Sequence, residues 1–303
     1  MEPWRHERTV FSVQCSVFSK STPCELAEVC LHCTLHSALC TLLMKPGLSP
    51  TERLDWTLYA KDAHAFVFGL EEPVLWTKDE HDQERPEKPF PDYDYLRCIL
   101  DCLLVSGRFL RPLEASYALA WGIPLTHLER QASMGMVFME KSRQVLASWV
   151  CCAYILWRAK FHPHQLCIVQ SKKEDDAVKF VFIKEAQQAR ISFMESRLPL
   201  WLQDGLFIGH QETPLRNKRE FVKRSDSGHL WFPNGSHIWA VPQGGDIIRS
   251  NTPSCLFSDE AAFQPAFALA YQACLPSLKG GGQGVFISSA EIGDFATLIE
   301  AEV

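Results

Sequence analysis

The sequence lacks an apolar run long enough to cross a membrane. Its longest apolar stretches, such as residues 145–157, span about a dozen residues, whereas a membrane-spanning helix needs roughly 20. The start of the chain also lacks the continuous apolar core and small-residue cleavage site of a secretory signal peptide. These absences predict a soluble protein without a membrane partner.

Neither sign of charge dominates the chain. Its 303 residues include 30 Lys plus Arg and 36 Asp plus Glu, a formal net charge of −6, and 47% of the residues are hydrophobic. This composition excludes collagen, coiled coils and wholesale disorder, and no repeat of solenoid length occurs. Because the chain as a whole repels a polyanion, contact with nucleic acid would require a local basic surface.

The first 43 residues differ in composition from the rest. They are rich in Ser, Thr and Cys, hold five of the 12 cysteines and show no helical or strand periodicity. Cys30 and Cys33 could belong to a zinc site, but no second ligand pair follows at a recognised spacing. We therefore expect residues 1–43 to be a disordered or non-native leader, Met44 to be the functional start, and the cysteines to be free thiols in a reducing cytosol.

Residues 44–130 have the pattern of a helical N-terminal region. Ser49 or Thr51 is placed to cap a first helix, and the apolar spacing predicts another over residues 95–110. Between them, residues 77–93 combine charge with three prolines, which is typical of an exposed connector.

Residues 131–303 alternate short apolar strands with helices. Strands apolar on both faces and separated by helices predict an α/β fold, with a mostly parallel sheet flanked by helices. The expected strands are residues 136–139, 166–169, 236–241, 254–257 and 284–288, and the expected helices are 146–159, 174–197 and 263–274.

Polar residues suited to nucleotide chemistry follow two of these strands, where ligands bind such sheets. After the first strand, Lys141 and Ser148 bracket a turn into a helix, and could hold phosphate and Mg²⁺. After another, Asp259 could bind Mg²⁺ and Glu260 could polarise a water. Taken singly, these residues also fit surface charges or a helix cap.

Several connected stretches resemble the large terminase subunits of tailed bacteriophages, ATP-driven motors that package DNA into procapsids. The resemblance spans roughly residue 44 to the C-terminus and is carried by residues 140–144, by residues 164–177 with Gln170-Ser171-Lys172, and by residues 259–263. It implies a P-loop NTPase fold of the ASCE type, with ATP and Mg²⁺ as cofactors.

The resemblance also implies roles for individual residues. The lysine stands at the start of a deviant Walker A loop, so the nucleotide-binding residues would be Lys141, Ser142, Arg143, Gln144 and Ser148. Ser148 and Asp259 would hold Mg²⁺, with Glu260 as the catalytic glutamate. Arg249 would reach a neighbouring subunit's nucleotide, and the coupling motif would be Ser288, Ser289 and Ala290.

The partners implied by the resemblance are double-stranded DNA, a terminase small subunit and a portal protein. The chain would act as a homo-oligomeric ring in the bacterial host cytoplasm, encoded by a phage or prophage. Two features depart from the family. Leu146 stands where glycine is usual, and the chain ends soon after Ala290, so we expect a truncated ATPase core without a nuclease.

Two further features leave alternatives open. Lys172 and Lys173 fit a solvated helix start or a DNA contact, and the basic segment 216–224 fits a charged β-hairpin or a contact with DNA or a neighbouring subunit. The departures at Leu146 and after Ala290 also allow a non-catalytic remnant or interaction module that keeps the ATPase fold.

Overall fold

The computed structural model describes residues 48–78, 86–142, 145–183, 189–204, 228–265, 267–291 and 293–302. The chain divides into two units, Met1–Leu42 and Leu43–Val303, and every described residue belongs to the second. The division falls beside Met44, where the composition changes. The expected leader, with Cys30 and Cys33, lies outside the described residues.

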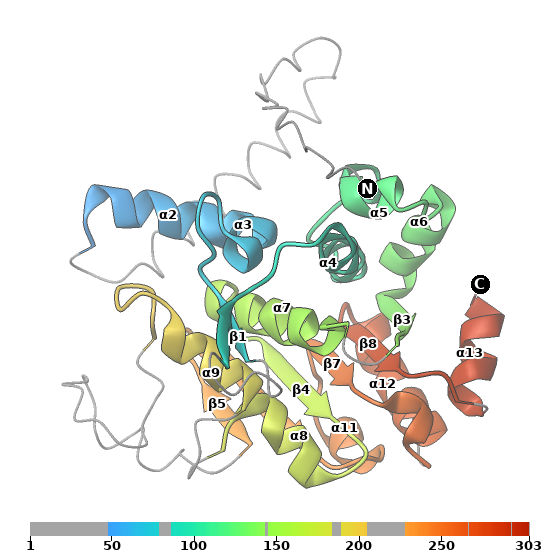
Figure 1. Ribbon diagram of the computed structural model, residues 1–303. Helices are drawn as coiled ribbons and strands as arrows, with labels where there is room; N and C mark the ends of the chain where they lie inside the picture. The colour runs from blue at the N-terminus through green and yellow to red at the C-terminus, as the bar shows by residue number, and fades with distance from the viewer. Residues whose placement is uncertain are drawn as a thin grey trace. The chain divides into compact units, whose positions relative to one another are not determined.

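A six-stranded sheet forms the centre of the second unit (Figure 1). Five neighbouring strands run parallel and the last pairs antiparallel at one edge. Their order across the sheet is β3 (Met136–Glu140), β8 (Gln283–Ser288), β7 (Cys255–Ser258), β4 (Leu166–Gln170), β6 (His237–Val241) and β5 (His229–Trp231). The expected α/β fold with a mostly parallel sheet is confirmed.

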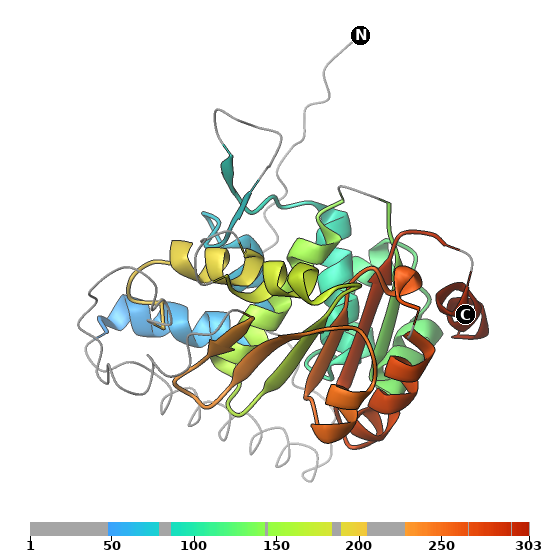
Figure 2. The ribbon, with the colours of Figure 1, turned by 90° about the horizontal axis from the view of Figure 1, so that it is seen from below.

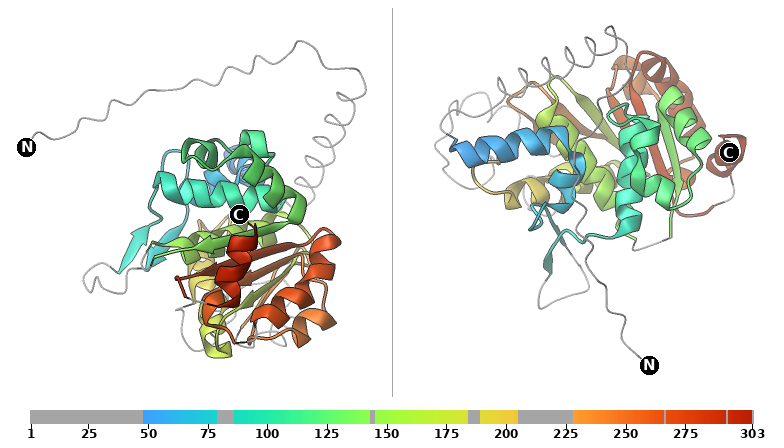
Figure 3. Two further views of the ribbon diagram at one scale, coloured as in Figure 1. Left: turned by 90° about the vertical axis from the view of Figure 1, so that its right-hand side faces the viewer. Right: turned by 90° about the horizontal axis from the view of Figure 1, so that it is seen from above.

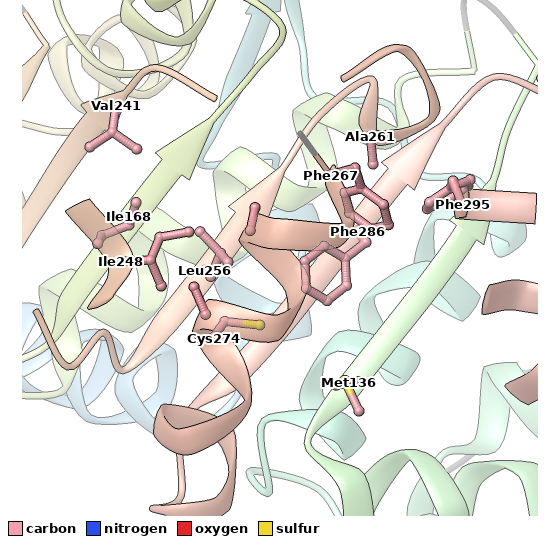
Figure 4. Close-up of a cluster of buried hydrophobic side chains, with 12 residues drawn as sticks. Met136, Ile168, Val241, Ile248, Leu256, Ala261, Phe267, Cys274, Phe286 and Phe295 are labelled. Carbon is pink, nitrogen blue, oxygen red and sulfur yellow. The ribbon is translucent and has the colours of Figure 1, made fainter. Parts of the chain in front are cut away.

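Helices cover both faces of this sheet (Figure 2). One face packs against α11 (Asp246–Ser250), α12 (Phe267–Lys279) and α13 (Asp294–Glu302), and Figure 4 shows strand side chains such as Leu256 and Phe286 beside Cys274 of α12. The other face carries α7 (Ala147–Phe161), α8 (Glu174–Val181) and α9 (Arg190–Arg197). Both faces are apolar because each is buried.

Helix α7 is covered on its outer side by helices from earlier in the chain. Every residue of α7 except Ser148 is buried, so the helix is enclosed on all sides, and its two buried charged residues are Arg158 and Lys160. It packs against α3 (Ala63–Phe68) and α4 (Asp94–Ser106), and Figure 3 shows α4 on the side of the sheet away from α12. The helical region and the sheet therefore form one compact unit.

Capping residues stand at the ends of two of the remaining helices. In α2 (Pro50–Lys61), Ser49 caps the helix in a capping box with Glu52, as expected. Helices α5 (Ser116–Ala120) and α6 (Leu125–Met134) follow α4. Gly135 ends α6 with a left-handed φ of 68°, and a Cβ there would lie 2.8 Å from the carbonyl oxygen of Gly282.

The single helix expected over residues 174–197 is wrong, and the expected connector contains two strands that were not predicted. Residues 174–197 form two helices, because Phe182 is extended (φ −160°, ψ 133°) and its carbonyl accepts a hydrogen bond from Gly228 N at 2.8 Å. Residues 77–93 are more than a connector, since β1 (Trp76–Lys78) pairs antiparallel with β2 (Glu87–Pro89). Both differences come from backbone hydrogen bonds that local sequence periodicity does not show.

Candidate functional site

A cavity of about 680 Å³ lies beyond the carboxyl ends of β3, β4 and β7. Because parallel strands end at one edge of a sheet, residues that follow separate strands meet there. Lys141 follows β3, Ser171 follows β4 and Asp259 follows β7, although β8 lies between β3 and β7. The cavity is lined by Lys141, Ser142, Val145, Leu146, Ala147, Ser148, Trp149, Ser171, Lys172, Asp176, Lys179, Phe180, Arg190, Asp259, Glu260 and Phe263.

Lys141 faces both carboxylates of the predicted pair. Its Nζ lies 3.3 Å from Glu260 Oε1 and 4.0 Å from Asp259 Oδ1. The side chains of Lys141 and Asp259 are 11% and 9% exposed, whereas that of Glu260 is 34% exposed and reaches the open part of the cavity. One cation therefore balances two carboxylates at the cavity wall, with Glu260 on the solvent side.

Ser148 joins Asp259 from the first turn of α7. Its hydroxyl donates a hydrogen bond to Asp259 Oδ1 at 2.9 Å. Burial raises the pKa of Asp259, while the charge of Lys141 and the hydrogen bond from Ser148 act to lower it. The hydroxyl and carboxylate that the sequence proposed as metal ligands are therefore in contact, although 111 positions separate them.

The backbone is strained at two places on the cavity wall. Leu146 has φ 54° and Glu260 has φ 51°, both in the left-handed region that disfavours residues with a side chain. Such conformations cost of order 1–3 kcal/mol each and cluster at functional sites. Leu146 also directly precedes α7, so the position where the resembled family has glycine requires a conformation that glycine adopts freely.

Ser288 connects the two loops of the site from the end of β8. Its carbonyl oxygen accepts a hydrogen bond from Lys141 N at 2.8 Å, and its hydroxyl accepts one from Ala262 N at 3.1 Å. Ser289 Oγ is buried with no hydrogen-bond partner within the described ranges, and Ala290 is exposed. Ser288 thus lies under the cavity, between the lysine loop and the carboxylate loop.

The structure does not bring every predicted residue to the cavity. Arg249 on α11 is exposed, pairs with Asp246 at 3.5 Å and is not among the lining residues. A residue that acts on a neighbouring copy need not line its own cavity, so its predicted role stays a prediction. Arg143 and Gln144 lie outside the described residues, as does the basic segment 216–224.

Two residues that line the cavity, Lys172 and Arg190, were not predicted from the sequence to belong to it. Lys172 directly follows Ser171 at the end of β4, so the same strand-end rule could have included it. Arg190 begins α9 and lies with its guanidinium over the rings of Phe180 and Trp149. No sequence pattern marks Arg190, because only the packing of α9 against α7 and α8 brings it to the site.

The donor set fits a Mg²⁺ ion bound together with a phosphate ligand. Mg²⁺ keeps several waters and takes one or two carboxylates plus substrate phosphates rather than an all-protein cage. Asp259 and Ser148 supply such a partial set. No group of three or more His, Cys, Asp or Glu side chains placed to hold a metal occurs in the described part of the chain.

Two comparisons with known proteins were negative. No protein-family model matches the chain, and no curated protein matches it significantly.

Across the described ranges, none of the helices combines the length and apolar character that crossing a membrane requires. All seven described cysteines are buried free thiols, as the sequence predicted: Cys98, Cys102, Cys151, Cys152, Cys167, Cys255 and Cys274.

Proposed function

We propose that this protein binds and hydrolyses ATP with Mg²⁺ at the cavity beyond β3, β4 and β7. The observation that carries the proposal is the convergence of Lys141, Ser148, Asp259 and Glu260 on one cavity from three separate segments. Each has the chemistry that one part of phosphoryl transfer needs. Lys141 is a cation that can bind phosphate, Ser148 and Asp259 can bind the metal ion, and the carboxylate of Glu260 can orient a water. If these residues formed ion pairs only to stabilise the fold, they would not need to line a cavity of this size.

The topology of the sheet supports a P-loop NTPase of the ASCE type. In that class an additional strand separates the strand before the phosphate loop from the strand before the catalytic glutamate. Here β8 occupies that place between β3 and β7. Ser288 at its end contacts both loops, which is the position a coupling residue would need.

Each residue of the site would have a separate role in the reaction. Lys141 binds phosphate oxygens and releases the carboxylates it now faces. Ser148 and Asp259 hold Mg²⁺, which when bound neutralises charge on the phosphates. Glu260, the more exposed carboxylate, orients a water and accepts its proton.

The wider role follows from the terminase resemblance. We propose an ATPase of a phage DNA-packaging motor that acts as a ring on double-stranded DNA in the host cytoplasm, with a small subunit and a portal as partners. In that ring, Arg249 would contact the neighbouring subunit's nucleotide. Its exposure on α11 leaves it accessible for such a contact.

Titration with ATP and Mg²⁺ tests the proposal directly. Lys141→Ala should weaken ATP binding by about ten- to hundredfold, because it removes a charge-assisted contact of roughly 1.5–3 kcal/mol. Lys61→Ala, at the exposed end of α2, is the matched control and should bind as the parent does. Turnover should then be measured with and without double-stranded DNA. Absence of ATP binding by the parent, or equal binding by Lys141→Ala, rejects the proposed site.

A non-catalytic module that keeps the fold is the second candidate. It is favoured by Leu146, whose side chain lines the cavity while its backbone holds a left-handed conformation. Under this alternative, ATP binds without turnover, or neither occurs although the protein is folded. ATP turnover that is lost on changing Glu260 would exclude it.

A further inference from the structure

The cavity contains an arginine that the sequence motifs do not include. Arg190, the first residue of α9, lines the cavity together with Lys141 and Asp259. Its guanidinium lies 4.4 Å from the ring centre of Phe180 on α8 and 5.7 Å from that of Trp149 on α7. Two aromatic rings from two different helices thus hold the guanidinium in place.

Arg190 differs from the paired cations around it. Lys141 faces Glu260 at 3.3 Å, and Lys179 bonds Asp176 at 2.8 Å. By contrast, the guanidinium of Arg190 makes no hydrogen bond or ion pair with any residue in the described part of the chain. Its side chain is oriented by ring contacts while its N–H donors remain available, which is the arrangement that bidentate recognition of a phosphate needs.

The position of Arg190 relative to the carboxylates indicates which phosphate it would meet. In the sheet, β7 lies between β3, which leads to Lys141, and β4, which precedes α8 and α9. Asp259, at the end of β7, lines the same cavity as both cations. On the proposed ATP site, the carboxylates would lie at the reacting end of the nucleotide, and the cavity that they line also contains Arg190.

We propose, on the basis of the ATP site above, that Arg190 is a phosphate-binding residue of the same chain that recognises the γ-phosphate and so distinguishes ATP from ADP. Phe180 and Trp149 are its positioning residues. This role differs from the one expected of Arg249, which requires a neighbouring copy. A contact within the chain acts independently of protein concentration, whereas a contact between copies does not.

Calorimetric titration of ATP and ADP, each with Mg²⁺, tests this assignment. Arg190→Ala should weaken ATP binding by about ten- to hundredfold and ADP binding by less than about twofold, because only ATP presents the terminal phosphate. Arg190→Lys should restore part of the ATP affinity, since it keeps the charge but loses the fork of donors. The effects should be the same at all protein concentrations.

Arg197→Ala provides the matched control on the same helix. Arg197 pairs with Glu87 outside the cavity, so its variant should keep both affinities. If Arg190→Ala lowers only thermal stability and leaves the ratio of ATP to ADP affinity unchanged, Arg190 is a packing residue and the inference is wrong while the ATP site stands. If the parent binds neither nucleotide, the proposed function fails and the inference fails with it.

Discussion

Two lysine–carboxylate clusters in this fold have the same composition but different geometry. In the cluster between α7 and α9, Lys160 Nζ lies 3.0 Å from Glu195 Oε1 and also pairs with Asp204, and Lys160 and Glu195 have no exposed side-chain surface. In the cavity cluster, Lys141 stands 3.3 Å and 4.0 Å from its two carboxylates, and Glu260 is 34% exposed. The first is closed by short contacts and the second is open.

The closed cluster also satisfies its oxygens from the backbone. Asp204 N donates a hydrogen bond to Glu195 Oε1 at 2.7 Å, and the two carboxylates raise the pKa of Lys160 against the opposing effect of burial. A cluster completed in this way leaves no donor for a ligand. The cavity cluster leaves Lys141 in a longer pairing, which under the proposed function a phosphate would replace. Geometry rather than residue type therefore distinguishes the closed cluster from the open one.

The largest effect should come from breaking the closed cluster. Lys160→Met leaves Glu195 and Asp204 buried without their cation, and should lower the free energy of unfolding by about 3–5 kcal/mol. Lys141→Met should lower it by less, because Glu260 is reached by solvent and Asp259 keeps its hydrogen bond from Ser148. Denaturant unfolding of both variants measures the difference. Equal losses would show that the two clusters have the same structural role.

Glu260→Gln should produce the next largest effect, on turnover alone. The amide keeps the size of the side chain but cannot accept the proton of the attacking water, so ATP hydrolysis should fall by about 10²-fold or more while ATP binding survives. Steady-state turnover and equilibrium binding measure the two quantities separately. Asp259→Asn is the comparison, since it should weaken the Mg²⁺ dependence of binding. Hydrolysis at the parental rate by Glu260→Gln would remove Glu260 from the mechanism.

A smaller effect is expected at the strained loop beside the open cluster. Leu146→Gly removes the cost of a left-handed φ of 54°, and should raise the free energy of unfolding by up to about 1 kcal/mol. Leu146→Ala keeps that cost but removes most of the bulk from the cavity. If both variants bind ATP more tightly but only the glycine variant gains stability, bulk and backbone strain are separate effects. A loss of ATP affinity in both would show that the leucine side chain supports the site.

The smallest effect should follow from removing residues 1–43. We expect thermal stability and nucleotide affinity to stay unchanged, because the chain divides beside Met44 and both clusters lie in the second unit. Thermal unfolding and ATP titration of the shortened chain test this. A large loss in either measurement would show that the leader contributes to the fold.

Most strands could be predicted from the sequence because each is a short apolar run bounded by polar residues. The expected strands 136–139, 166–169 and 284–288 fall within observed strands, and those expected over 236–241 and 254–257 overlap observed strands that begin one residue later. The strand-end rule then placed Lys141, Ser148, Asp259 and Glu260 near one edge, and these residues line one cavity. The helix expected over 174–197 was wrong, because the backbone contact between Phe182 and Gly228 is not encoded in local periodicity.

The sequence by itself therefore determined the layer pattern and the residues that follow the strands, since apolar periodicity and strand ends are local properties. Only the tertiary structure decided that β8 separates β3 from β7, that Ser288 joins both loops, and that Arg190 enters the cavity. It also decided that Lys160 is enclosed while Lys141 is not. The physical reason is that pairing order, enclosure and ring contacts depend on segments far apart in the chain, which become neighbours only when the core packs.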